Sequence, residues 1–345
     1  MTEPRSASHQ PVDTRGRALR DLRVSVTDRC NLRCRYCMPR EIFGPGFTFL
    51  PRNELLHFEE IARVVGAFAR AGVKKVRLTG GEPLLRADLA DLVAMVAAVP
   101  GIDDIALTTN GSLLARHADR LQAAGLTRIT VSLDTLDDET FAKLADTDVT
   151  LASVLEGVSA AAAAGFAPIK LNAVIRRNWN EADIEGLAAY AREHGHTMRF
   201  IEYMDVGDTN GWRLDDVVPA AVIVDRLAAV WPLEPVSPGY PGEVANRYRY
   251  LDGGGEVGVI SSISKPFCGT CTRARLSAIG EVYTCLFAST GHDLRALLRS
   301  GADDQAIDDA IAGLWTARAD RYSELRAAHA SHEGPHKVEM SYIGG

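Results

Sequence analysis

The sequence has no long hydrophobic run, although 46% of its 345 residues are hydrophobic. No stretch approaches the roughly 20 consecutive apolar residues that a membrane-spanning helix needs. The first twenty residues contain four arginines and no apolar segment of the kind found in a secretory signal. We therefore expect a cytoplasmic protein with no membrane partner.

An excess of positive charge is also absent, because 38 Lys and Arg residues face 45 Asp and Glu residues, for a net charge of -7. This balance excludes a protein whose whole surface is built to bind nucleic acid. It leaves room for a local basic pocket that binds a small anion. The length and ordinary composition favour one large α/β domain, or a large domain with an appendage.

Cysteine is scarce, and all six cysteines fall into two groups of three. The groups are Cys30, Cys34, Cys37 and Cys268, Cys271, Cys285. In a reducing cytosol such groups more often bind a metal or take part in chemistry than form disulfides. A structural zinc site uses four ligands, whereas a reactive site leaves one position open. Three cysteines per site therefore favour reactive sites.

Short β-branched runs alternate with helical patterns up to about residue 204. The expected strands are Leu22–Thr27, Lys75–Leu78, Ile105–Thr109, Arg128–Leu133, Ile169–Ile175 and Met198–Met204. The expected helices are Glu54–Ala71, Ala87–Val99, Arg116–Ala124, Leu151–Ala164 and Asn180–His194. This alternation predicts parallel strands with helical crossovers, in a partial (β/α)6 TIM-type barrel with its site at the carboxyl ends of the strands. An open doubly wound sheet is the alternative.

The pattern changes after Met204. A helical stretch, Pro219–Val230, and a strand-like Val257–Ile263 flank a segment rich in Pro, Gly and Tyr. We therefore expect an N-terminal extension over residues 1–20, the barrel over 21–234, and a smaller C-terminal module over 235–345 that carries the second cysteine group.

The first cysteine group has the spacing C-x3-C-x2-C directly after the first expected strand. Three thiolates in one loop suit a 4Fe–4S cluster whose fourth iron has no protein ligand. That iron is free to bind S-adenosylmethionine, and the spacing, with Tyr36 as its aromatic residue, resembles the signature of the radical S-adenosylmethionine (radical SAM) superfamily. A zinc loop with a distant fourth ligand is the alternative.

Polar or glycine-rich motifs follow the next three strands. They are Gly80-Gly81-Glu82-Pro83, Thr108-Thr109-Asn110-Gly111 and Ser132-Leu133-Asp134. Glycine pairs allow the backbone to approach a ligand closely. At successive strand ends of one barrel, these motifs are expected to line one pocket.

The second cysteine group has the spacing C-x2-C-x13-C, and Arg273 and Arg275 follow Cys271 at alternating positions. In an extended segment both arginines point the same way, where two guanidinium groups suit phosphate oxygens. The group predicts a second cluster with a free iron for a substrate. A zinc knuckle with His292 as fourth ligand, and a solvated basic strand face, are the alternatives.

The segment Asp21–Cys30, the block Cys268–Phe287 and the terminal Gly344-Gly345 together resemble the GTP 3′,8-cyclase family, the molybdenum cofactor biosynthesis protein A family. The similarity runs from about Arg20 to the last residue. Ala278-Ile279-Gly280 departs from it slightly, since family members commonly carry an acidic residue before this glycine.

The resemblance implies two 4Fe–4S clusters, S-adenosylmethionine as cosubstrate and GTP as substrate. For S-adenosylmethionine it implies contacts with Tyr36, Gly81, Glu82, Asn110, Ser132 and Met204. For GTP it implies contacts with Arg23, Arg77, Thr108, Lys170, Arg273, Ala274 and Arg275. It gives catalytic roles to Arg273, Arg275, Gly344 and Gly345, with Arg199 nearby.

The family further implies an electron donor of the flavodoxin or ferredoxin type, a homodimer, and a downstream cyclic pyranopterin monophosphate synthase. Two other functions stay open from the residues alone. One is a radical enzyme that modifies a peptide, and the other is a non-catalytic metal-binding or electron-transfer module.

Overall fold

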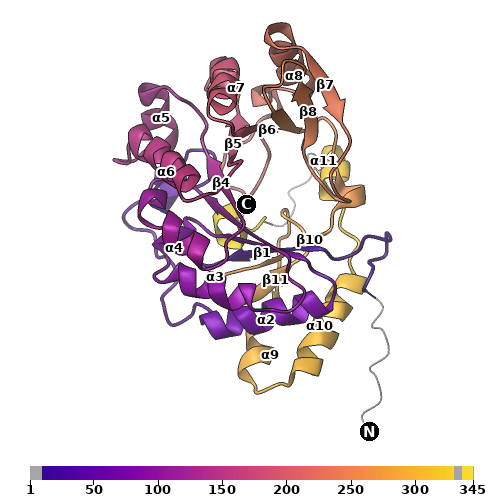
Figure 1. Ribbon diagram of the computed structural model, residues 1–345. Coiled ribbons are helices and arrows are strands. Elements are labelled where there is room, and N and C mark those ends of the chain that lie inside the picture. Colours follow the sequence, from indigo (N-terminus) through magenta and orange to yellow (C-terminus); the bar gives the residue numbers. More distant parts are fainter. Residues whose placement is uncertain (1–9, 330–335, 345) are drawn as a thin grey trace.

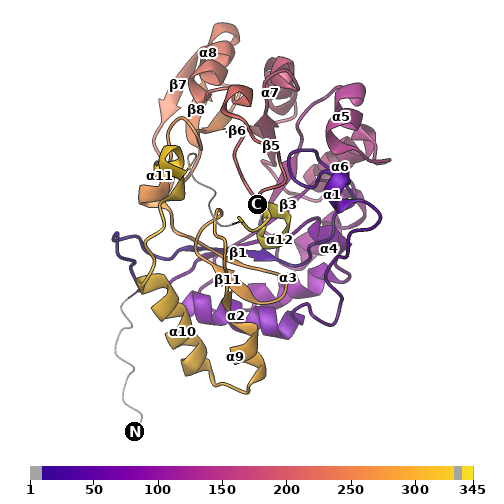
Figure 2. The same ribbon diagram turned by 180° about the vertical axis from the view of Figure 1, so that it is seen from behind.

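The central feature of the computed structural model is a β-sheet that curves around the middle of the molecule (Figures 1 and 2). The structure describes residues 10–329 and 336–344. Within them the strand order is β12-β11-β10-β1-β2-β3-β4-β5-β6-β9-β8-β7. The parallel strands are β1 (Asp21–Ser25), β2 (Lys75–Thr79), β3 (Asp104–Thr109), β4 (Arg128–Ser132), β5 (Lys170–Ile175), β6 (Thr197–Glu202), β9 (Glu256–Ile260) and β10 (Arg273–Leu276).

The consecutive order β1 to β6 distinguishes between the two expected α/β folds. A doubly wound sheet starts in its middle and reverses direction, whereas a barrel adds each strand beside the previous one. The expectation of a partial barrel is confirmed, and the doubly wound alternative is wrong.

The helices lie mostly on the outer face of the sheet, although the last of them lies inside it, where Met340 and Ser341 line the inner cavity. They are α1 (Arg40–Phe43), α2 (Phe58–Arg70), α3 (Leu89–Ala97), α4 (Ala118–Ala123), α5 (Asp138–Ala145), α6 (Leu151–Ala163), α7 (Ile184–Glu193), α8 (Ala220–Val230), α9 (Arg295–Arg299), α10 (Asp304–Thr316), α11 (Tyr322–His329) and α12 (Met340–Ile343). Short 3-10 helices are η1 (Pro83–Leu85), η2 (Leu114–Arg116), η3 (Glu181–Asp183), η4 (Leu214–Asp216) and η5 (Cys268–Thr270). None of the helices in this part of the chain is long and apolar enough to cross a membrane.

Residues alternate across the sheet between the core and the interior. On β1, Leu22 and Val24 are fully buried in the hydrophobic core, whereas Asp21 and Arg23 face a cavity on the inner side. Helix α2 packs against this core face of the sheet through Val64 and other apolar residues at helical spacing. Strand periodicity thus separates a dry outer core from a polar interior.

The C-terminal part of the chain extends both edges of the sheet. On one edge β10 pairs in parallel with β1 and leads to the antiparallel β11 (Glu281–Tyr283) and β12 (His292–Asp293). On the other, β9 pairs with β6 and continues into β8 (Asn246–Tyr250) and β7 (Leu233–Val236). The predicted boundary after residue 234 falls within β7, and the division into barrel and C-terminal module stays a prediction.

Candidate functional site

A cavity on the inner side of the sheet is lined by both cysteine triplets. Its wall contains Cys30, Cys34 and Cys37 of the first triplet and Cys268, Cys271 and Cys285 of the second. The first group lies in the loop after β1, and the second flanks the hairpin of β10 and β11, in which β10 is paired with β1. Strand pairing therefore brings into one site two motifs that lie more than 200 residues apart in the sequence.

Most residues expected to contact S-adenosylmethionine line this cavity. They are Tyr36, Gly81, Asn110, Ser132 and Met204. The Tyr36 hydroxyl donates to Asp134 Oδ2 at 2.6 Å, and the backbone N–H of Val174 donates to Asp134 Oδ1. Asp134 thus fixes the position of the Tyr36 hydroxyl, and partial burial raises the pKa of Asp134 to about 6.

The glycine pair after β2 packs against the first cysteine loop. A Cβ atom on Gly81 would lie 2.3 Å from the carbonyl oxygen of Arg29, and one on Gly80 would lie 2.4 Å from that of Thr27. The Gly81 N–H donates to the Thr27 carbonyl at 2.8 Å. The close approach expected from the glycines is therefore, at least in part, to the backbone that carries Cys30.

Glu82 is buried outside the cavity wall and links two strand ends. Its carboxylate accepts hydrogen bonds from the Thr109 hydroxyl and the Asn110 N–H, both at 2.7 Å, and from the Leu84 N–H at 3.0 Å. Burial raises its pKa to about 7 despite these bonds. Its expected contact with S-adenosylmethionine stays a prediction, since its oxygens are used within the protein.

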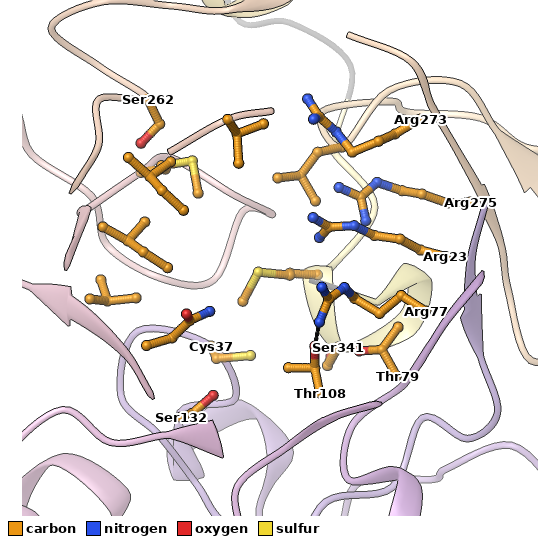
Figure 3. Close-up of a pocket in the computed structure, with 18 of the residues that line it drawn as sticks. Arg23, Cys37, Arg77, Thr79, Thr108, Ser132, Ser262, Arg273, Arg275 and Ser341 are labelled. Atoms are coloured by element: carbon orange, nitrogen blue, oxygen red, sulfur yellow. Dashed lines mark hydrogen bonds between the residues drawn. The ribbon is translucent and has the colours of Figure 1, made fainter. Parts of the chain in front are cut away.

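Four arginines form the basic wall of the cavity, and Figure 3 shows Arg273, Arg275, Arg23 and Arg77 in one column with their guanidinium groups toward the same side. The register explains this column, because Arg23 on β1 is the direct neighbour of Arg275 on β10 and of Arg77 on β2. The alternation expected for Arg273 and Arg275 is confirmed. None of the four has a carboxylate partner among the ion pairs of the described residues.

Like charges at adjacent strand positions repel one another, and burial strengthens the effect. Burial, with Arg77 and Arg273 nearby, lowers the pKa of Arg23 to about 9. Burial also lowers the pKa of Arg77, to about 10, and that of Arg275. The site therefore carries positive charge that an anionic ligand would offset.

The remaining residues expected to contact GTP are placed differently. Thr108 lines the cavity and accepts a hydrogen bond from Arg77 Nη1 at 2.8 Å (Figure 3). Ala274 is buried in the hydrophobic core, on the opposite face of β10 from its arginine neighbours. Lys170 is half-buried outside the cavity wall, and burial together with Arg199 and Arg128 lowers its pKa to about 7.

The C-terminal tail enters the site, since Met340 and Ser341 line the cavity, and Figure 2 shows α12 in the middle of the molecule. Arg275 Nη1 donates to the Gly344 carbonyl, and Ile343 is fully buried. Gly344 has φ of 78°, and a Cβ there would lie 2.2 Å from Thr79 Cγ2, so only glycine fits. Gly345 lies outside the described residues.

The cysteines of the first group suit a cationic cofactor. Burial raises the pKa of Cys30 to about 11, and burial with the neighbouring thiols Cys30 and Cys37 raises that of Cys34. Such sulfurs become thiolates only against positive charge such as iron. In the second group burial raises the pKa of Cys285 to about 11, whereas at Cys271 Arg273 and Arg318 outweigh burial and lower the pKa to about 6.

A zinc site with His292 does not fit the second group. His292 is exposed on β12 and lines a separate cavity, beside α10, from the one lined by the cysteines. Among the described residues, no group of three or more His, Cys, Asp or Glu side chains is placed to hold a single metal ion.

Sequence reasoning missed several groups of the cavity wall, among them Arg17 and Arg318, whereas Asp134 belongs to a motif expected to line it. Arg17 lies in the segment predicted to be an N-terminal extension. No local signal marks Arg17, because its role depends on contacts with residues about 250 and 300 positions away.

Comparison with known proteins identifies the relatives of this chain. Residues 24–191 match the family model of the radical SAM superfamily, and residues 196–324 match the model described as Molybdenum Cofactor Synthesis C. A GTP 3′,8-cyclase of Acidothermus cellulolyticus is 63% identical, with 97% of this chain and 99% of the relative covered. The chain belongs to the GTP 3′,8-cyclase family.

Other members of the GTP 3′,8-cyclase family are also similar over almost their full length. The Xanthomonas campestris pv. campestris protein is 50% identical over 96% of this chain and 97% of the relative. The Staphylococcus aureus protein is 46% identical over 96% and 98%. Membership of the radical SAM superfamily implies one 4Fe–4S cluster and S-adenosylmethionine.

A solved structure supports the fold assignment. SuiB of Streptococcus suis, bound to its precursor peptide SuiA, aligns with a TM-score of 0.61 over 93% of this chain and 75% of that chain. The identity is 15%, so the likeness concerns the fold alone and gives no support to the peptide-modifying alternative.

Proposed function

We propose that this protein is a GTP 3′,8-cyclase, a radical SAM enzyme that converts GTP to (8S)-3′,8-cyclo-7,8-dihydro-GTP in the first step of molybdenum cofactor biosynthesis. The observation that carries the proposal is the composition of one cavity. Its wall holds two cysteine triplets together with four arginines that have no carboxylate partner among the described residues. The full-length relatives with this name support the same conclusion.

The arginine column explains how GTP is held. A triphosphate carries several negative charges, and a guanidinium group binds its oxygens through a planar fork of donors. Arg23, Arg77 and Arg275 stand side by side at one register level, so they present a continuous row of such donors. Binding the triphosphate removes the repulsion within this row.

The second triplet would orient the base. Cys268, Cys271 and Cys285 would hold a second 4Fe–4S cluster with one iron free for the guanine ring. Anchored at both its phosphate and base ends, the nucleotide has its ribose between the two triplets. This positioning is the main contribution that a protein makes to radical chemistry.

A 4Fe–4S cluster at the first triplet supplies, when bound, the electron that splits the carbon–sulfur bond of S-adenosylmethionine. The 5′-deoxyadenosyl radical takes the hydrogen atom from C3′ of the ribose and becomes 5′-deoxyadenosine. The C3′ radical adds to C8 of guanine, and one further electron and one proton complete the product. The product is therefore an isomer of GTP, and each turnover uses two electrons in all.

The partners of this reaction belong to the same proposal. We infer an external electron donor of the flavodoxin or ferredoxin type, because both electrons come from outside the substrates. A homodimer in the cytoplasm and a downstream cyclic pyranopterin monophosphate synthase complete the assignment.

An anaerobic turnover assay tests the proposal. Reconstituted protein is incubated with dithionite, S-adenosylmethionine and GTP, and the products are identified by mass spectrometry. We expect 5′-deoxyadenosine and an isomer of GTP in equal amounts, with loss of the isomer in Arg273→Ala and Cys268→Ser. Equal 5′-deoxyadenosine formation with and without GTP, and no isomer, would show that the substrate assignment is wrong.

A further inference from the structure

The N-terminal segment before β1 folds against the second cysteine triplet. Asp13 and Arg17 form an ion pair in which Arg17 Nε lies 2.6 Å from Asp13 Oδ2, with side chains 0% and 2% exposed. Asp13 Oδ1 also accepts the backbone N–H groups of Arg15 and Arg17, both at 2.9 Å. These bonds close a turn over residues 13–17 and hold the buried Arg17 guanidinium group in place.

Arg17 and Arg318 hold the backbone of the second cysteine loop. Arg17 Nη1 donates to the Cys268 carbonyl at 2.7 Å and to the Asp320 carbonyl at 2.8 Å. Arg318 Nη1 donates to the Cys271 carbonyl at 2.8 Å and lies 3.4 Å from Asp13 Oδ2. One buried carboxylate therefore anchors two guanidinium groups, each of which holds a different cysteine of the triplet.

Trp315, near the end of α10, contacts both Arg17 and Arg318. Its indole N–H donates to the Arg17 carbonyl at 2.8 Å, and its ring lies 4.6 Å from the Arg318 guanidinium carbon. The Thr14 hydroxyl and N–H both donate to the Arg318 carbonyl, at 2.8 and 3.2 Å. The N-terminal segment and the end of α10 thus form a single support.

One donor of this support remains available. Arg17 Nη2 is buried and has no hydrogen-bond partner among the described residues, and Arg17 lines the cavity that contains the cysteines. A buried N–H group without a partner is unfavourable. A group bound in the cavity can accept this bond.

Stability alone does not explain the network. Burying charged groups costs several kcal/mol, and apolar side chains of similar volume often give equal or greater stability. What apolar residues cannot do is hold two carbonyl groups in fixed positions and leave a donor for the cavity.

We propose that Asp13, Arg17 and Arg318 are positioning residues of the second cysteine triplet. They fix the Cys268–Cys271 loop so that its thiolates face the cavity, and Arg17 Nη2 donates to the group bound there. The inference rests on the proposed function only in requiring that the second triplet holds an iron–sulfur cluster.

The test measures cluster occupancy rather than turnover. Arg17→Lys, Arg17→Gln and Arg318→Lys are reconstituted anaerobically, and their iron content and EPR spectra after reduction are compared with the parent. The signal of the first cluster is recognised by its change on addition of S-adenosylmethionine. We expect all three variants to lose the other signal, with iron falling to about half of the parent value and the first signal retained.

The controls separate positioning from general stability and from charge. Arg70→Gln removes the paired hydrogen bonds between α2 and Asp308 on α10, at 2.7–3.0 Å, and should keep both signals. If Arg17→Lys keeps the second signal, charge alone suffices and the inference is wrong. If the Arg17 variants lose both signals together, the network serves overall folding and the inference is again overturned. A parent with no second signal would refute the two-cluster proposal as well, whereas a parent with two signals and unaffected variants would refute the network alone.

Discussion

Arg23 provides a test in which stability and binding should change in opposite directions. Its guanidinium group lies between Arg77 and Arg275 in the strand register, and none of the hydrogen bonds or ion pairs found in residues 10–329 and 336–344 involves it. Arg23→Gln removes the charge and keeps a polar side chain of moderate length. We expect the ligand-free variant to be more stable than the parent and to bind GTP more weakly.

The expected gain in stability follows from the pKa of Arg23. Burial, Arg77 and Arg273 lower this pKa from 12.5 to about 9. At neutral pH the charged guanidinium group is therefore less favourable in the folded protein than in the unfolded chain. At about 1.4 kcal/mol per pKa unit, the upper limit is about 5 kcal/mol. Water in the cavity screens the repulsion, and we expect a gain of about 1–2 kcal/mol and a rise in Tm of roughly 2–4 °C.

The expected loss in binding comes from one charged hydrogen bond to phosphate. Such a bond contributes about 1.5–3 kcal/mol, so Kd for GTP should rise about 10- to 150-fold. Thermal unfolding of the ligand-free protein and isothermal titration with GTP measure the two effects. The matched control is Arg128→Gln, because Arg128 already has a carboxylate partner, with its Nε 2.8 Å from Asp104 Oδ1.

The control should show no gain in stability. The reasoning is refuted if Arg23→Gln lowers Tm as Arg128→Gln does, or if its Kd for GTP is that of the parent. Either result would mean that Arg23 is not part of an anion-binding row.

Three further predictions concern the glycines and Glu82. In Gly344→Ala the positive φ costs about 1–2 kcal/mol, and the new Cβ would lie 2.2 Å from Thr79 Cγ2. We therefore expect GTP turnover to fall about tenfold, and the added change Thr79→Ser, which removes Cγ2, should partly restore it in the same assay. Gly81→Ala should displace the first cysteine loop and reduce the iron bound there, whereas Gly46→Ala, with no atom within 4 Å of the new Cβ, should leave the iron content unchanged. The pKa of Glu82 is raised from 4.5 to about 7, so the stability that the folded protein gains from its protonation is complete below pH 4.5 and is lost as pH rises through 7. Urea unfolding at several pH values should therefore show that the free energy of unfolding depends less on pH in Glu82→Gln, by at most about 3 kcal/mol.

Local sequence patterns were sufficient to predict the central strands. The six expected strands lie within two residues of β1 to β6, because each is a short run rich in β-branched and apolar residues. The helix expected from Glu54 begins only at Phe58, since His57 and Glu60 form a capping box there. Helix α5 was not expected at all, although Asp137 caps it by accepting the Thr140 N–H.

The C-terminal strands could not be placed from local patterns. Nothing near Arg273 or Val257 shows that β10 adds beside β1 and β9 beside β6, because pairing depends on the whole curved sheet. The cysteine spacings predicted the chemistry of the two triplets, but only this pairing puts them in one cavity. The family resemblance indicated Arg23 and Arg77 as substrate contacts, and the register gives the physical reason why they act together.

The distribution of charge in the fold explains why the ends of the chain converge on the site. Although the net charge is -7, the sheet carries a row of arginines with no carboxylate partner in residues 10–329 and 336–344, and such a row is unfavourable until an anion binds. The tail satisfies part of this row, since the Gly344 carbonyl accepts from Arg275. A carbonyl dipole compensates a full charge only partly, so a triphosphate competes well for the same guanidinium group. The Gly344 carbonyl is therefore expected to release Arg275 when GTP binds. The close approach of Gly344 to Thr79 is possible because glycine has no Cβ atom.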